Sequence, residues 1–62
     1  MSAEDPLARA ESLLERLDAT RAKLEATDEP EQAIELLGEL AELAKEVQAE
    51  IERAKRDADA RA

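Results

Sequence analysis

The 62-residue sequence contains no cysteine, no histidine and no aromatic residue, and it has a single glycine. Without cysteine, neither a disulfide nor a thiolate metal site can stabilise a chain of this size, for which one hydrophobic core is barely sufficient. Without histidine, no serine or threonine has an imidazole base to activate it, and no glycine-rich phosphate loop is present. We therefore expect no catalytic residue, no metal site, no cofactor and no enzymatic activity of the chain on its own.

Long apolar runs are also missing, and no hydrophobic signal segment follows Met1. We therefore expect a cytoplasmic protein with no membrane association. The formal net charge is −8, with 17 acids against nine bases. Such a charge disfavours nonspecific binding to nucleic acid.

The residues that are abundant favour helix. Alanine occurs 14 times and leucine nine times, and no long β-branched run interrupts them. The length limits the chain to one small domain, so the sequence predicts a single all-α unit.

Apolar residues recur at alternating spacings of three and four in both halves of the chain. The first half has Leu7, Ala10, Leu14, Leu17, Arg21 and Leu24 at these positions, and the second half has Ala33, Leu37, Leu40, Ala44, Val47, Ile51 and Ala54. These heptad patterns are typical of coiled-coil packing. Folded back at residues 27–29, they pair layer by layer with Arg21 opposite Leu37, which predicts an antiparallel αα-hairpin.

Capping residues and prolines place the helix ends. Asp5 followed by Pro6 fits an N-cap and a first helical position, although Ser2 offers an earlier start. Pro30 fits the first turn of a second helix, with Asp28 as its N-cap. We expect helices over about residues 5–26 and 30–58, a turn at 27–29 and a frayed basic end at 59–62.

The apolar surface is wider than one partner helix can cover, because further leucines and an isoleucine flank both seams. The simplest resolution is a homodimer that forms a four-helix bundle, and a helix from another protein would serve equally well. The predicted core and oligomer interface comprises Leu7, Leu13, Leu14, Leu17, Leu24, Ile34, Leu36, Leu37, Leu40, Leu43, Ala44, Val47 and Ile51.

Two residues, one in the seam and one in the middle of the second predicted helix, have alternative interpretations. Arg21 either packs its stem and extends its guanidinium to water or Glu25, or disfavours slipped pairings by placing a charge in the seam. Gly38 is either a tolerated surface glycine or, with Ala41 and Ala44, part of a low-profile patch for another helix.

A row of glutamates follows one side of the second predicted helix, and we expect all its members to point outward. The row comprises Glu35, Glu39, Glu42, Glu46 and Glu50. It is either a solvated face or a docking face for a basic partner. The basic end, with Arg53, Lys55, Arg56 and Arg61, is either a self-paired helix end or a contact for nucleic-acid phosphates.

Several segments resemble the small subunit of exodeoxyribonuclease VII. They are LEATDEP (24–30), EQAI (31–34), ELAK (42–45), QAEI (48–51) and Ala54. The family's turn glycine corresponds to Thr27 here. This resemblance covers about residues 13–54 and implies a non-catalytic subunit that binds a large nuclease chain through its hairpin.

In size and plan the chain is also similar to Rop, a plasmid copy-number regulator whose hairpin dimer binds paired RNA loops. The residues in common are Asp28 and EQA (31–33) near the turn. RNA binding of that kind needs basic and aromatic residues on one face, which this acidic chain lacks. We therefore expect first a self-associating interaction or scaffold module, then an accessory nuclease subunit, and last an RNA-binding dimer.

Overall fold

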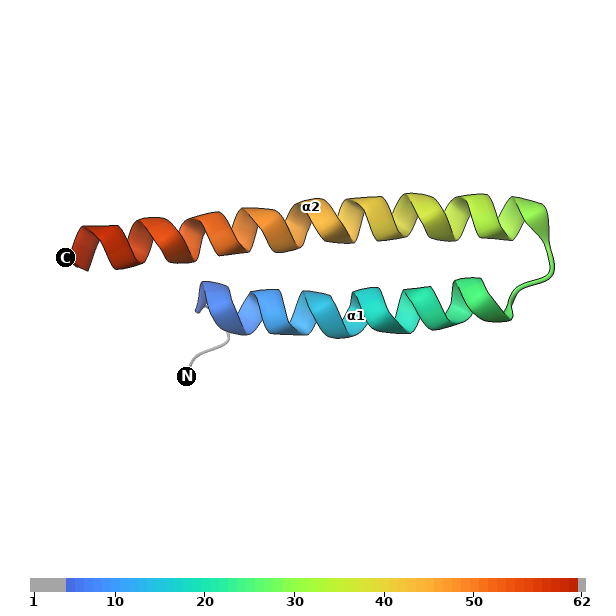
Figure 1. Cartoon of the computed structure of the whole chain (residues 1–62), viewed down its shortest axis with the longest axis horizontal. Helices are drawn as coiled ribbons and strands as arrows, with labels where there is room; N and C mark the ends of the chain where they lie inside the picture. Colours follow the sequence, from blue (N-terminus) through green and yellow to red (C-terminus); the bar gives the residue numbers. More distant parts are fainter. Residues whose placement is uncertain (1–4, 62) are drawn as a thin grey trace.

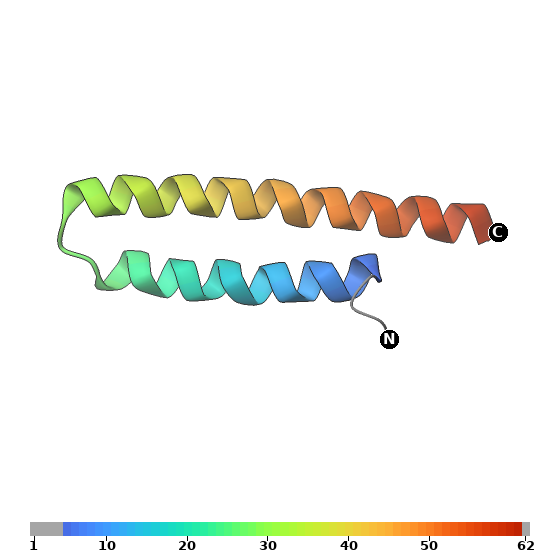
Figure 2. The same cartoon turned by 180° about the vertical axis from the view of Figure 1, so that it is seen from behind.

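The computed structural model describes residues 5–61, which form two antiparallel helices. Helix α1 spans Pro6–Ala26 and helix α2 spans Pro30–Arg61. The molecule is a rod 49 Å long and 18 by 13 Å across (Figures 1 and 2). The predicted all-α hairpin is confirmed, whereas Ser2 and Ala62 lie outside the described residues.

The start of α1 follows the predicted capping. Asp5 is the N-cap, its Oδ1 accepts a hydrogen bond of 2.8 Å from the Leu7 amide, and Pro6 opens the helix. The proline has no amide hydrogen to leave unsatisfied, and its φ is already helical, so the two residues together define this end.

In the turn at residues 27–29, the side chain that accepts a backbone hydrogen bond is that of Thr27 and not that of Asp28, the predicted cap. The Thr27 hydroxyl accepts a hydrogen bond from the Glu29 amide at 3.3 Å and donates one to Gln32 Oε1 at 2.9 Å. The Glu29 carbonyl accepts the first helical bond, from the Ala33 amide at 2.9 Å. Pro30 then enters the first turn of α2, as its missing donor requires.

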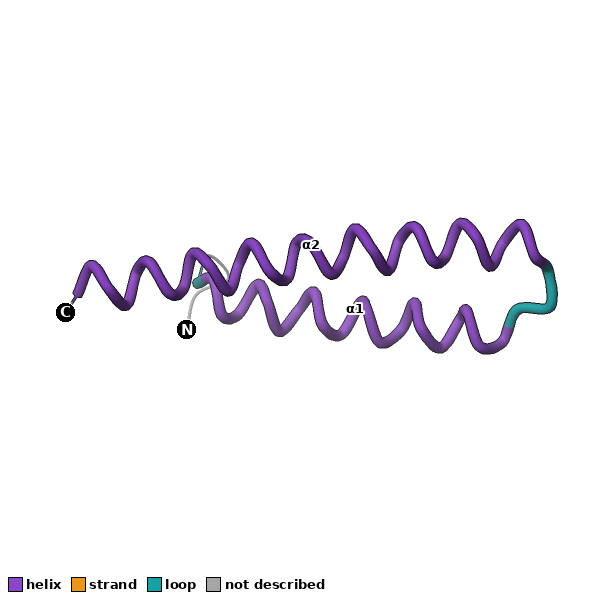
Figure 3. Tube along the Cα trace, turned by 45° about the horizontal axis from the view of Figure 1, so that its top comes forward, coloured by secondary structure: helices purple, strands orange, loops and turns teal. Residues whose placement is uncertain are grey.

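Helix α2 is longer than expected and continues past the beginning of α1 (Figure 3). It reaches Arg61 instead of about residue 58, and residues 59–61 are helical, not frayed. Because Arg9 of α1 lies opposite Glu50 of α2, residues 55–61 extend beyond Pro6, by about 10 Å at 1.5 Å per residue. We refer to residues 55–61 as the overhang.

The seam that closes the hairpin differs from the predicted one. Seam residues that are buried or half-buried are Ala10, Leu13, Leu17, Thr20 and Leu24 of α1, and Ala33, Leu36, Leu40, Leu43, Val47, Glu50 and Ala54 of α2. The seam of each helix consists of two heptad rows, and one of the two is the predicted row. The other observed row lies one residue before its predicted counterpart, for example at Leu13 instead of Leu14.

The predicted seam residues that the observed seam leaves out are exposed in the hairpin. Relative exposures are 54% for Leu7, 49% for Leu14, 54% for Leu37 and 49% for Ile51, and Arg21 and Ala44 are also exposed. The predicted pairing of Arg21 with Leu37 inside the hairpin is thus wrong. The physical reason is the charge. Arg21 binds Asp18 and Glu25, which are exposed on its own helix, whereas Glu50 of the observed seam binds one arginine on each helix.

The two polar seam residues are both satisfied. Thr20 is 8% exposed, and its hydroxyl donates a 2.8 Å hydrogen bond to the Arg16 carbonyl one turn earlier. Glu50 is also 8% exposed and binds two arginines. Burying these groups therefore leaves no unmet hydrogen bond to oppose folding.

Gly38 is surrounded by open space within one chain. A Cβ built there would meet nothing within 4 Å, and the backbone φ is not in the left-handed region. The hairpin itself therefore does not require a glycine at this position.

Leu43, with 6% exposure, is among the most deeply buried side chains of the seam. We expect Leu43→Ala to lower the free energy of unfolding by about 2–5 kcal/mol, because the smaller side chain leaves a cavity. Urea denaturation at fixed protein concentration measures this change. The matched control is Ile34→Ala, at a position 69% exposed, which should change stability by less than about 0.5 kcal/mol. Equal losses for the two variants would contradict the observed seam.

Candidate functional site

A three-residue ion cluster ties the beginning of α1 to α2. Arg9 Nε donates to Glu50 Oε1 at 3.0 Å, and Arg53 Nη1 donates to Glu50 Oε2 at 2.7 Å. The Glu50 side chain is 11% exposed, against 35% for Arg9 and 53% for Arg53. The carboxylate is thus held from both sides while each guanidinium keeps contact with water, which limits the cost of burying the charge.

The cluster alters the ionisation of Glu50. Burial opposes the charged form, but the hydrogen bond from Arg9 and the positive charges of Arg53 and Arg9 outweigh it. The pKa of Glu50 therefore lies below its ordinary value. The expectation that every member of the glutamate row points outward is wrong for Glu50, because a carboxylate with two arginine partners is stable in the seam.

The other four glutamates of the row are exposed, and three of them border a shallow groove between the helices. Glu39, Glu42 and Glu46 form the α2 side of this groove, and Arg16 and Lys23 form the α1 side. The predicted docking face for a basic partner thus lies beside bases of the same chain. Its charge is partly balanced before any partner arrives.

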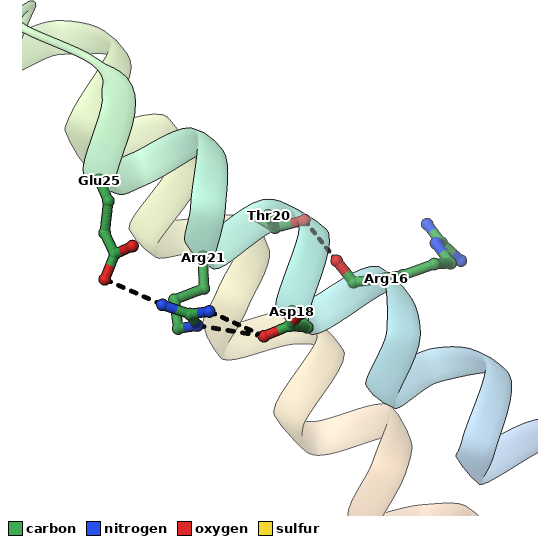
Figure 4. Close-up of polar contacts among 5 residues, drawn as sticks. All are labelled: Arg16, Asp18, Thr20, Arg21 and Glu25. Carbon is green, nitrogen blue, oxygen red and sulfur yellow. Dashed lines mark hydrogen bonds and ion pairs between the residues drawn. The ribbon is translucent and has the colours of Figure 1, made fainter.

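Arg21 lies on a different side of α1 from Arg16 and is held at the surface (Figure 4). Its Nε and Nη2 donate to Asp18 Oδ1 at 3.2 and 3.0 Å, and Nη1 donates to Glu25 Oε2 at 2.9 Å. The hydrogen bond to Asp18 and the charge of Glu25 raise the pKa of Arg21. The predicted contact with Glu25 is confirmed, and Asp18 is a second partner that the heptad pattern did not indicate.

The side chains excluded from the seam form one apolar face, which comprises Leu7, Leu14, Leu37, Ala44 and Ile51. Four of them directly follow a seam residue in the sequence, as Leu14 follows Leu13, and Leu7 follows the half-buried Pro6, seven residues before Leu13. Each therefore lies about 100° further around its helix in the same rotational sense. Two antiparallel helices are related by a two-fold axis perpendicular to the plane that contains both helix axes. The same rotational sense on each helix therefore places both rows on the same side of that plane. Ile34 is turned further from the seam and is 69% exposed.

The apolar face has three layers along the rod. In the heptad order, Leu7 pairs with Ile51 near the chain ends, Leu14 with Ala44 in the middle, and Arg21 with Leu37 near the turn. The layer near the turn contains the only charge, and Asp18 and Glu25 hold that charge to one edge. The arrangement is suited to packing against another helical surface, because aliphatic side chains dominate it.

The chemistry of residues 5–61 gives no indication of a metal site. Within that range no group of three or more histidine, cysteine, aspartate or glutamate side chains is placed to hold a metal ion. Over the same residues, neither helix combines the length and the apolar character that a membrane span needs.

Comparisons with known proteins found no match to a protein-family model, a curated protein or a solved structure. The resemblances to the exodeoxyribonuclease VII small subunit and to Rop therefore stay predictions.

Glu50 provides a pH test of the ion cluster. Because its pKa is lower in the folded chain than in the unfolded chain, ionised Glu50 stabilises the fold above its ordinary pKa. This contribution is lost as the pH falls through the lower, folded value. We expect Glu50→Gln to be less stable than wild type at pH 7 and to lose less stability on acidification, as measured by urea denaturation at several pH values.

The control for this experiment is Glu46→Gln, which removes the same charge from an exposed position on the same helix. Its pH dependence should stay close to that of the wild type. If the Glu50 and Glu46 variants had the same acid profile, the buried cluster would not contribute to stability.

Proposed function

We propose that this protein is a non-catalytic interaction module that associates with a second copy of itself through the apolar face. The observation that supports this most strongly is the half-exposure of Leu7, Leu14, Leu37 and Ile51 on one side of the hairpin. Completing their burial contributes about 1 kcal/mol per side chain. Both copies present the same four residues, so a dimer gains this contribution from eight side chains.

The thin core of the single hairpin favours association. Among residues 5–61, no side chain is less than 2% exposed, and the buried apolar residues are Ala10, Leu36, Leu43 and Val47. A chain of this length without disulfide or metal is marginally stable by itself. A second copy supplies the missing second layer of a helical domain.

The accessible surface area agrees with this proposal. A compact protein of 6.8 kDa exposes about 4,000 Å², whereas this chain exposes 4918 Å². Two such hairpins packed into a compact dimer would bury about 3,000 Å² in total. That area falls within the range of about 2,000–5,000 Å² seen for obligate homodimers.

Leu37 and Ile34 offer a matched pair of substitutions to aspartate, three residues apart on α2. Leu37→Asp places a carboxylate within the apolar face, whereas Ile34→Asp makes the same change in charge outside it. We expect Leu37→Asp to raise the dimer dissociation constant at least about 30-fold, since two aliphatic contacts are lost per dimer and two charges are desolvated. Sedimentation equilibrium across a hundredfold range of concentration measures the constant.

Ile34→Asp should raise the same constant no more than about threefold. A wild type with a mass of 6.8 kDa throughout the range would refute self-association. Equal weakening by the two substitutions would show that the chains associate through another surface.

A further inference from the structure

The charge of the hairpin is unevenly distributed along its length. The half that contains the turn, residues 14–46, carries ten acids and four bases, a net charge of −6. The half that contains the chain ends, residues 5–13 and 47–61, carries six acids and five bases, a net charge of −1. Charges at opposite ends of the rod are screened from one another at physiological salt, whereas charges at the same end are screened less.

Two face-to-face arrangements of a dimer distribute this charge differently. With the turns at the same end, that end carries −12 and the other end −2. With the turns at opposite ends, each end carries −7. The second arrangement separates the two acidic turns and places each one beside the less acidic end of the other chain.

The layers of the apolar face favour the same arrangement. With the turns together, the layer of Arg21 and Leu37 in one chain faces the same layer in the other chain, so a single layer contains two arginines, at its opposite edges. With the turns apart, each layer of Arg21 and Leu37 faces the layer of Leu7 and Ile51 in the other chain. The middle layers, Leu14 with Ala44, then face each other.

The overhang has the length that this second arrangement needs. Measured from the middle layer at 1.5 Å per residue, residues 55–61 lie about 16–26 Å towards the chain ends, and the turn lies about 20 Å in the other direction. In a dimer centred on the middle layers, the overhang of one chain therefore reaches the turn of the other. The overhang has three bases and two acids, a net charge of +1, and its Lys55, Arg56 and Arg61 come to the height of Asp28 and Glu29.

We infer that the second copy packs antiparallel to the first, with its overhang against the acidic turn. This inference rests on the proposed self-association and adds the relative orientation of the two chains. It gives a role to the overhang, which extends past the beginning of α1, and to Arg21, whose position makes the two arrangements unequal.

Spin-label distances distinguish the two arrangements. The chain has no cysteine, so Asp28→Cys in the turn and Ala60→Cys in the overhang each introduce one thiol, and nine of the ten acids of the turn half remain. In the antiparallel dimer, labels at position 28 of the two chains should be about 40 Å apart. A mixture of the two labelled variants should add a distance of about 20 Å, between the turn of one chain and the overhang of the other.

The antiparallel arrangement would be overturned if the labels at position 28 were within about 20 Å of each other and the mixture gave about 45 Å between turn and overhang. Self-association would remain intact in that case. A monomeric mass for the labelled chains, with no distance between them, would overturn both proposals. Sedimentation of each labelled variant provides the mass.

Discussion

The satisfaction of charge determines which side of each helix closes the hairpin. Two apolar rows compete for the seam on both helices, and they differ mainly in the polar residue that each includes. One choice buries Glu50, which Arg9 and Arg53 bind at 3.0 and 2.7 Å. The other would bury Arg21, whose partners Asp18 and Glu25 are on its own helix. A buried charge with partners on both helices is the less costly option.

This choice has a consequence for function, because the rows left outside are the more apolar ones. The hairpin closes with a thin core, and a face of leucines and an isoleucine stays half-exposed. A single hairpin cannot cover that face with its own residues. The same electrostatic constraint that sets the intramolecular seam therefore creates the surface through which the chain is proposed to associate. The placement of Arg21 on that surface favours the antiparallel orientation that we infer for the second copy.

Much of the fold was predictable because local chemistry specifies it. Asp5, Pro6 and Pro30 mark the helix ends, and the heptad spacing identifies one row of each seam. The displaced row was not predictable from spacing, because residues three and four positions away from a seam residue are equally good candidates. Glu50 is the member of the glutamate row whose burial the sequence pattern did not predict. The signal was its heptad spacing after Leu36 and Leu43, together with Arg53 one turn later, but Arg9 is 41 residues away and only the fold brings it close.

The most direct test of association through the apolar face is the detection of methyl contacts between chains by isotope-filtered NMR, in a mixture of labelled and unlabelled protein. We expect contacts between chains for the methyl groups of Leu7, Leu14, Leu37 and Ile51, and contacts within one chain only for those of Leu43. Contacts between chains that involve Leu43 and omit the four exposed residues would contradict association through this face, as would a spectrum with no contacts between chains.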